Sequence, residues 1–436
     1  MAVSPNMQNI IDKIVLAMKD PTLRRRIGFT IGALVLFRLL AAIPVPGVNP
    51  ATLSQLLNSS QFFGFLNIFS GGGLSNLSIV MLGVGPFITA SIIVQVLTMI
   101  FPSWKALMHE EGEAGREKLS QYSRLLAAPL AVLQAVGFII LFQSENVLPH
   151  LGTFAFVVNV IVIAAGSILL TWIGELVSEF GIGNGVSLII FAGIVARLPM
   201  DFVQNYQKLL GSNMANLPFY ILVLIIAIAA TAGVIYVTEA ERSVPITYAK
   251  QVRGNKVYGG SSTYLPLRLN QSGVIPIIFA LSILLFPQII FGALAKWATH
   301  PLIADWSHTL LLWLTPPSWT YGILYFLMVV LFTYFYTAVT FDPVMISENL
   351  QRSGAFIPGV RPGEHTRDHL AAIVTRITLV GAVFLGAVAV LPLIIQAFSP
   401  DTTQSFAVGG TALLIVVSVV IDLLKKLDAQ VSMREY

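Results

Sequence analysis

Two pairs of branched aliphatic residues have the most informative spacing in this sequence. Val84 and Ile88 are four positions apart, as are Val186 and Ile190, so each pair shares one helix face. Each pair lies beside a break rich in Gly or Pro. Such side chains bind no ion and transfer no proton, but a constriction made of them excludes water and ions by dewetting while yielding to a soft, variable passenger. The chemistry that they offer is that of a hydrophobic seal.

Patterns for catalysis, phosphate binding or metal binding are weak. The sequence has no Cys, which excludes disulfides, thiolate catalysis and zinc–thiolate sites. His109-Glu110-Glu111 lacks the second His of the His-Glu-x-x-His zinc pattern, and His365 with His369 fit a solvated helix start better than a metal site. The Gly-rich run 181–185 lacks a preceding strand, and no Walker-type phosphate loop occurs. We therefore expect no enzyme activity, no metal and no cofactor.

The composition is that of a membrane protein that crosses the bilayer many times. Hydrophobic residues make up 56% of the chain and charged residues 11%, too few to cover the surface of a soluble domain. A spanning helix needs about 20 apolar residues. The apolar runs predict ten spans: Ile27–Ile43, Leu77–Met99, Leu125–Phe142, Phe154–Val177, Val186–Leu198, Leu217–Val237, Gly273–Leu294, Tyr321–Phe341, Ile373–Ala397 and Val408–Leu424.

Basic residues orient these spans. Lys and Arg gather in alternate connections, whereas the other connections hold only Lys208 and Lys296, and Arg38 and Arg197 lie within spans. By the positive-inside rule both termini are cytosolic. We divide the chain into a cytosolic N-terminal segment 1–26, an N-terminal half 27–200 with spans one to five, an external connection 201–216, a C-terminal half 217–424 with spans six to ten, and a cytosolic tail 425–436.

The two halves show matching interruptions. Gly83-Val84-Gly85-Pro86 in span two corresponds to Gly273-Val274-Ile275-Pro276 in span seven, and Gly183-Asn184-Gly185 before span five corresponds to Gly409-Gly410 in span ten. Because each half has an odd number of spans, the halves enter the membrane from opposite sides and form an inverted repeat. Paired breaks of this kind indicate where a transport path runs. The alternative is that Gly and Pro are simply frequent in membrane helices.

Segments outside the spans also carry information. The apolar run Phe62–Phe69 is too short to cross a bilayer, and it ends at Ser70-Gly71-Gly72-Gly73 before span two. Irregular backbone at this depth must be buried in protein or line a cavity. On the cytosolic side, the connections 238–270 and 342–372 are long and basic. They suggest a docking site for a large, acidic partner, although topology alone also demands basic loops there.

Over essentially its whole length the sequence resembles the SecY family, central subunits of the bacterial protein-conducting channel. The motifs that carry the resemblance are Ser70-Gly71-Gly72-Gly73-Leu74-Ser75, Gly112-Glu113-Ala114-Gly115-Arg116, Ser120-Gln121-Tyr122, Gly181-Ile182-Gly183-Asn184-Gly185, Tyr248-Ala249-Lys250, Leu265-Pro266-Leu267 and the run 354–363. The resemblance implies an all-α integral membrane protein, with ten transmembrane helices in two inverted five-helix halves around a central hourglass pore and a short plug helix.

The resemblance also implies roles for particular residues. The pore ring maps to Val84, Ile88, Val186, Ile190, Ile278 and Ile415. The plug maps to Phe62, Phe63, Phe65, Leu66, Ile68 and Phe69. A lateral gate between spans two and three and spans seven and eight maps to Thr89, Gln134 and Phe286, and partner docking maps to Tyr248, Lys250 and Arg361.

The expected function is that of a passive protein-conducting channel in the bacterial plasma membrane. It moves unfolded secretory polypeptides and releases hydrophobic segments sideways into lipid. The partners that the resemblance implies are the translocation ATPase SecA, the ribosome, the single-span subunits SecE and SecG, signal-sequence-bearing polypeptides and membrane lipid, with no specific nucleic acid beyond ribosomal RNA. A secondary transporter for a small solute, motivated by the repeat and by Arg38, is the alternative, and an intramembrane enzyme is a third.

Overall fold

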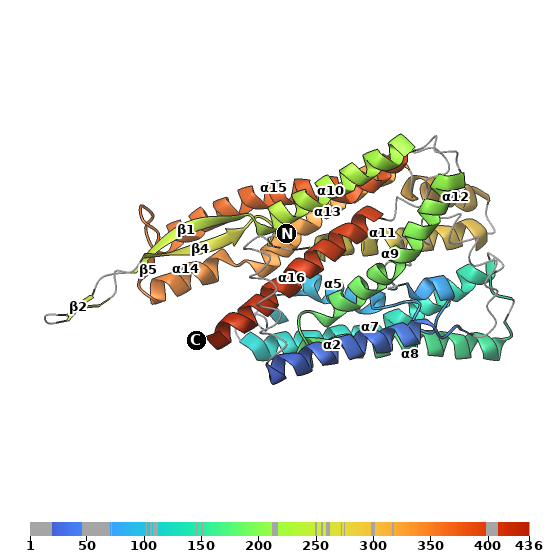
Figure 1. The fold of residues 1–436 in the computed structure, drawn as a ribbon, viewed down its shortest axis with the longest axis horizontal. Coiled ribbons are helices and arrows are strands. Elements are labelled where there is room, and N and C mark those ends of the chain that lie inside the picture. The colour runs from blue at the N-terminus through green and yellow to red at the C-terminus, as the bar shows by residue number, and fades with distance from the viewer. Residues whose placement is uncertain are drawn as a thin grey trace, which may run out of the picture.

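A computed structural model gives the fold (Figure 1). It describes residues 20–45, 70, 72–101, 103–104, 107, 112–144, 147–149, 151–211, 217–248, 251–253, 256–258, 262–271, 273, 275–297, 301–315, 318–397 and 409–435. The predicted plug and Lys250 lie outside these residues.

A helix lies at each of the ten predicted spans. These helices are α2 (Pro21–Ala41), α5 (Gly85–Ile100), α7 (Gly112–Ser144), α8 (Thr153–Phe180), α9 (Gly185–Gly211), α10 (Leu217–Glu239), α11 (Ile275–Trp297), α13 (Trp319–Thr340), α15 (Glu364–Ala397) and α16 (Gly409–Glu435). Two shorter helices, α12 (Pro301–Leu314) and α14 (Pro343–Arg352), lie between spans. The sequence sets some of the starts: Asp20 accepts a hydrogen bond from the Thr22 amide at 2.9 Å, and Pro21 opens α2.

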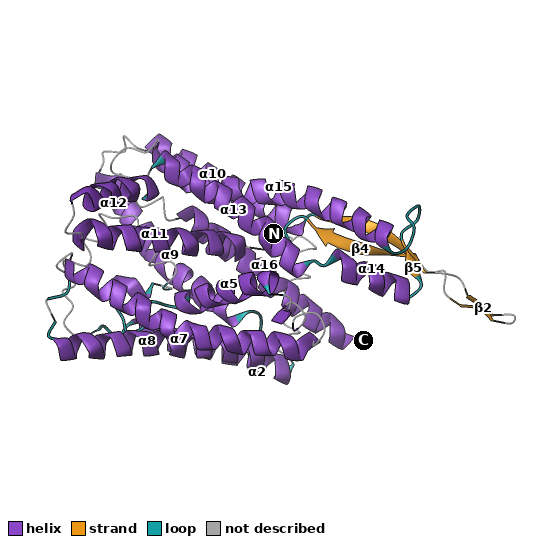
Figure 2. Cartoon of the chain, turned by 180° about the vertical axis from the view of Figure 1, so that it is seen from behind, coloured by secondary structure: helices purple, strands orange, loops and turns teal. Residues whose placement is uncertain are grey.

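The helices form three layers. In Figures 1 and 2, α2, α7 and α8 lie on one side, α10, α13 and α15 lie on the other, and α5, α9, α11 and α16 lie between them. By length and composition, five described stretches could each cross a membrane: Glu117–Gln143, Thr153–Phe180, Leu217–Glu239, Trp319–Arg352 and Glu364–Ile395. The apolar stretches of α5, α9 and α11 are shorter, and these helices belong to the central layer, where other helices surround them.

The contacts between helices repeat from one half to the other. α5 contacts α7 as α11 contacts α13, α7 contacts α8 as α13 contacts α15, and α8 contacts α9 as α15 contacts α16. Likewise, α2 packs on α8 and α9 as α10 packs on α15 and α16. The principal contacts between the halves are α5 with α11 and α9 with α16, so that each helix meets its own counterpart. This is the arrangement that a two-fold inverted repeat requires.

The connections predicted to be cytosolic form a small sheet rather than loops. The strands β1 (Glu241–Tyr248), β4 (Ser262–Arg268) and β5 (Ala355–Phe356) pair antiparallel in the order β4-β1-β5, with Val244 opposite Leu265. A second hairpin joins β2 (Gln251–Arg253) to β3 (Lys256–Tyr258). The sheet, α14 and the first turns of α15 project together at one end of the molecule (Figure 1). Inward-facing Val244, Ile246 and Leu267 are buried, which explains why the strands form there.

Four predicted boundaries differ from the structure. α9 continues through Pro199 to Gly211, so most of the predicted connection 201–216 is helical. α5 begins at Gly85 rather than Leu77, because the glycine break ends the turns before it. α16 continues to Glu435, through most of the predicted tail 425–436. Finally, the connections 238–270 and 342–372 contain the strands, α14 and the first turns of α15.

Candidate functional site

The six residues predicted to form the ring lie in, or packed against, one hydrophobic cluster: Val84, Ile88, Val186, Ile190, Ile278 and Ile415. All but the half-buried Val186 are buried, with exposed fractions between 0% and 8%. They come from α5 and the turn before it, α9, α11 and α16, the four helices that make the principal contacts between the halves. The ring residues therefore lie where the halves meet and not on the outer surface of the bundle.

A glycine with a left-handed backbone precedes each of three central helices. Gly83 (φ +57°), Gly183 (φ +90°) and Gly273 (φ +61°) each stand two residues before the first residue of α5, α9 and α11. Residues with side chains rarely adopt these angles. The breaks seen in the sequence are thus turns that end just before the helices carrying ring residues.

The backbone of one break has a partner that sequence reasoning missed. The Ser167 hydroxyl of α8 donates a 2.8 Å hydrogen bond to the Gly83 carbonyl, and both groups are buried. Carbonyls at bilayer depth need such partners, because no water is available there. The signal in the sequence is only a Gly-Ser pair within an apolar run, and such pairs are common in membrane helices.

The predicted gate residues lie on helices that meet. Thr89 of α5 is buried, and its hydroxyl donates to the Gly85 carbonyl at 3.1 Å, whereas Gln134 of α7 is half-buried. Phe286 belongs to α11. α5 contacts both α7 and α11, and α11 contacts α13. The four helices predicted to border a lateral gate are therefore neighbours in the structure.

Backbone pairing joins the parts of the chain that precede and follow the predicted plug segment. The Val45 amide donates to the Leu77 carbonyl at 2.8 Å, the Ile79 amide donates to the Ile43 carbonyl at 3.0 Å, and Pro44 forms a bridge with Ser78. Beside this bridge, Leu74 and Leu77 are buried against α7 side chains such as Phe138 and Phe142. The chain on either side of the segment 46–69 is thus held in one place.

Arg38, a charged residue predicted within a span, lies beside Gly72. It stands in the last turn of α2, and its Nη1 lies 3.4 Å from where a Cβ on Gly72 would sit. The ring positions around the cluster carry only aliphatic side chains. A charged binding site for a small solute, which the transporter alternative requires, is thus not formed by the six ring positions themselves.

Two of the predicted docking residues lie at the end of the molecule where the sheet projects. Tyr248 is exposed at the end of β1, where it pairs with Ala355 of β5, and Arg361 is exposed shortly after β5. Of the three residues predicted for docking, the structure therefore places two on the projecting sheet and the turn that follows it.

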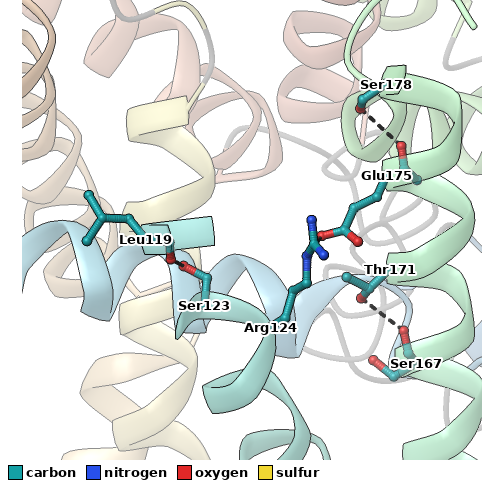
Figure 3. Close-up of polar contacts among 8 residues, drawn as sticks. Leu119, Ser123, Arg124, Ser167, Thr171, Glu175 and Ser178 are labelled. Atoms are coloured by element: carbon teal, nitrogen blue, oxygen red, sulfur yellow. Dashed lines mark hydrogen bonds and ion pairs between the residues drawn. The ribbon is translucent and has the colours of Figure 1, made fainter. Parts of the chain in front are cut away.

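An ion pair ties α7 to α8. Figure 3 shows Arg124 and Glu175 pointing toward one another, while Ser123 and Thr171 donate to carbonyls four residues earlier in their own helices. Arg124 is about half exposed, with 49% of its side chain accessible, so solvent screens the pair and its contribution to stability is modest. Among the described residues, no cluster of His, Asp or Glu could hold a metal.

Comparisons with known proteins agree with this architecture. The model of the SecY family matches residues 78–424. A protein translocase subunit SecY from Corynebacterium glutamicum is 40% identical over 439 residues, covering 97% of this chain and 98% of that protein. The protein translocase subunit SecY of Escherichia coli K12 is 39% identical over 429 residues, covering 95% of this chain and 93% of that protein.

Solved structures share the fold. The structure of a protein conducting channel superposes with a TM-score of 0.65 at 21% identity, covering 96% of this chain and 94% of that chain. Sec61 in the canine ribosome–channel complex from the endoplasmic reticulum superposes with a TM-score of 0.62 at 19% identity and the same coverage, 96% and 94%. The expected fold of two inverted helical halves is confirmed.

Proposed function

This chain belongs to the SecY family, and we propose that it is a passive protein-conducting channel of the bacterial plasma membrane. Unfolded secretory polypeptides would cross through it, and apolar segments would leave it sideways into lipid. The observation that carries the proposal is the burial of six aliphatic ring residues, contributed by both halves, in one cluster where the halves meet.

The ring acts as a seal because its side chains offer water and ions nothing to bind. A polypeptide in transit has no fixed shape or charge, so its conduit must make few specific contacts. Branched aliphatic side chains meet that need, since their interactions are non-directional and follow the contacted area. When the passenger leaves, contacts between the ring residues close the gap and the constriction dewets.

The lateral gate is the seam between α5 and α11. The other seam is formed by α9 and α16; α10 follows α9 in the chain and packs on α16. That covalent connection between the halves favours separation at the α5–α11 seam, near Thr89, Gln134 and Phe286. For a signal sequence with 7–15 apolar residues, the free energy of transfer from the pore into lipid is then favourable by about 25 cal/mol per Å² of apolar area transferred.

The plug is the segment Phe62–Phe69, with Phe62, Phe63, Phe65, Leu66, Ile68 and Phe69 as its apolar side chains. It belongs to the chain between two points that the bridge at residues 43–45 and 77–79 brings together. A tether of this kind lets a segment move out of a pore and return to it without being lost.

The channel depends on partners for energy and assembly. Tyr248, Lys250 and Arg361 are the proposed docking residues for the motor ATPase SecA and the ribosome. The positive-inside pattern places both termini and the projecting sheet in the cytosol. Single-span subunits of the SecE and SecG type complete the assembly, and contact with nucleic acid is limited to ribosomal RNA.

Reconstitution tests the proposal directly. Vesicles that contain this chain with a motor ATPase, ATP and small subunits should protect a secretory precursor from added protease. A precursor whose apolar signal segment is interrupted by Arg is the matched control, and it should be protected poorly. Equal protection of both precursors, or rapid counterflow of a small solute by this chain alone, would contradict the proposal.

A further inference from the structure

A backbone contact of unusual closeness joins α8 to the non-helical turns before α5. A Cβ added to Gly166 of α8 would lie 2.1 Å from the Ile79 carbonyl oxygen and 2.8 Å from its carbon. Both distances are shorter than real Cβ contacts, and the obstacle is backbone, which cannot rotate away. Only glycine fits at this point of α8.

The same contact recurs in the other half. A Cβ added to Gly381 of α15 would lie 2.6 Å from the Leu269 carbonyl oxygen and 3.4 Å from its carbon. Ile79 stands six residues before Gly85, the first residue of α5, and Leu269 stands six residues before the first residue of α11. The outer helices α8 and α15 therefore hold corresponding atoms of the chain at corresponding distances from a central helix.

Each contact is followed by a left-handed glycine whose carbonyl has a side-chain donor. Ser167 donates to the Gly83 carbonyl at 2.8 Å, and the Asn270 amide nitrogen donates to the Gly273 carbonyl at 3.2 Å. The donor comes from α8 in one half and from the turn itself in the other. Both halves thus satisfy the backbone of the turn, as the bilayer interior requires.

Two ring residues follow these contacts closely in the chain. Val84 directly follows Gly83, and Ile278 stands in the first turn of α11, so a shift of either turn moves a ring residue. We propose that Gly166 and Gly381 are positioning residues. They fix the position of the ring residues by letting the chain ahead of α5 and α11 pack directly against the backbone of α8 and α15. The inference rests on the proposed function, because it concerns the seal.

Other glycines of the bundle supply matched controls. A Cβ on Gly386 of α15 would lie 2.8 Å from the ring of Phe326, so an alanine there disturbs the packing of α15 on α13 but touches no turn before a central helix. A Cβ on Gly32 of α2 would meet nothing within 4 Å. G386A reproduces the disturbance of helix packing without touching a turn. G32A reproduces the change from glycine to alanine without any steric conflict.

The experiment measures ion leak through the idle channel in liposomes, together with the thermal unfolding of each variant. We expect G166A and G381A to raise the leak about tenfold or more, since overpacking of ordinary size shifts a two-state equilibrium by that factor. G386A should lower the unfolding temperature without raising the leak, and G32A should change neither. An equal rise of the leak in G386A, or no rise in G166A and G381A, would overturn the inference.

Three further variants keep the result decisive. S167A removes only the hydrogen bond to the Gly83 carbonyl, so it tests the position of the turn even where G166A fails to accumulate. We expect a smaller rise of the leak in S167A and none in S167T, which keeps the hydroxyl donor. I278G in the same assay tests the seal itself. If I278G leaks while G166A, G381A and S167A do not, only this inference fails, and if I278G does not leak, the proposed seal fails.

Discussion

Ile277 and Ile278 offer a sharp test of the ring, because they are neighbours of the same residue type in α11. Both belong to the central cluster, with exposed fractions of 0% for Ile277 and 7% for Ile278. Successive residues of a helix project about 100° apart, so the two side chains point in different directions. Only Ile278 is assigned to the ring, and substituting each by alanine separates sealing from packing.

The expected magnitude follows from the burial. Truncating a buried Ile to Ala costs about 2–5 kcal/mol. In Ile277→Ala this loss destabilises the closed and open states of the folded channel equally, so the unfolding temperature drops. In Ile278→Ala part of the loss falls on the closed state alone, because the contacts between ring residues exist only while the ring is closed. A loss of about 2 kcal/mol there favours the leaky state by roughly 30-fold.

The assay is ion efflux from liposomes that contain the idle channel, with thermal unfolding of the same preparations measured in parallel. Ile278→Ala should leak strongly and Ile277→Ala should not, although both lose stability. Equal leak from the two variants would refute the assignment of Ile278 to the seal, since the leak would then follow the general loosening of the cluster.

Three further predictions concern the plug, a break and the docking surface. Deleting Phe62–Phe69 should raise ion leak while preserving some export, and an unchanged leak would remove the plug role. Gly83→Ala places a side chain at φ +57° at a cost of about 1–2 kcal/mol, so it should raise the leak, whereas Gly85→Ala, with open space around its Cβ, should not. Arg361→Glu should slow motor-driven export without changing ion leak, and the exposed Arg352→Glu is the control; equal slowing by both would argue against a specific role for Arg361.

The spans and the inverted repeat were predictable because they depend on local composition. An apolar run of sufficient length has few alternatives to a membrane helix, and Gly83 and Gly273 mark their turns by residue type alone. The ring positions followed from these breaks and from the family resemblance. The structure brings those residues into one cluster, while their role in sealing stays a prediction.

The projecting sheet was missed for a physical reason. Val244, Ile246 and Leu267 alternate with exposed residues, which is the period of a strand, but Pro245 and Pro266 interrupt the pattern and read as loop. Pro266 is tolerated because β4 is an edge strand, and Pro245 is tolerated because β5 pairs only with Thr247 and Tyr248, so that β1 has no partner on that side at Pro245.

Long-range backbone contacts lay beyond the reach of sequence reasoning. Nothing near Gly166 shows that the Ile79 carbonyl approaches it, because small residues are common in membrane helices and the partner is far away in the chain. Pro199 posed the opposite problem, since it suggested an end to a helix that continues to Gly211.

The central claim is that a translocating chain passes among the ring residues. Because the protein has no Cys, a single thiol placed at Ile278 reports on that position alone. A secretory polypeptide arrested in transit should crosslink to I278C and not to I228C, whose parent side chain on α10 is 62% exposed. Crosslinks from I228C with none from I278C would contradict the claim.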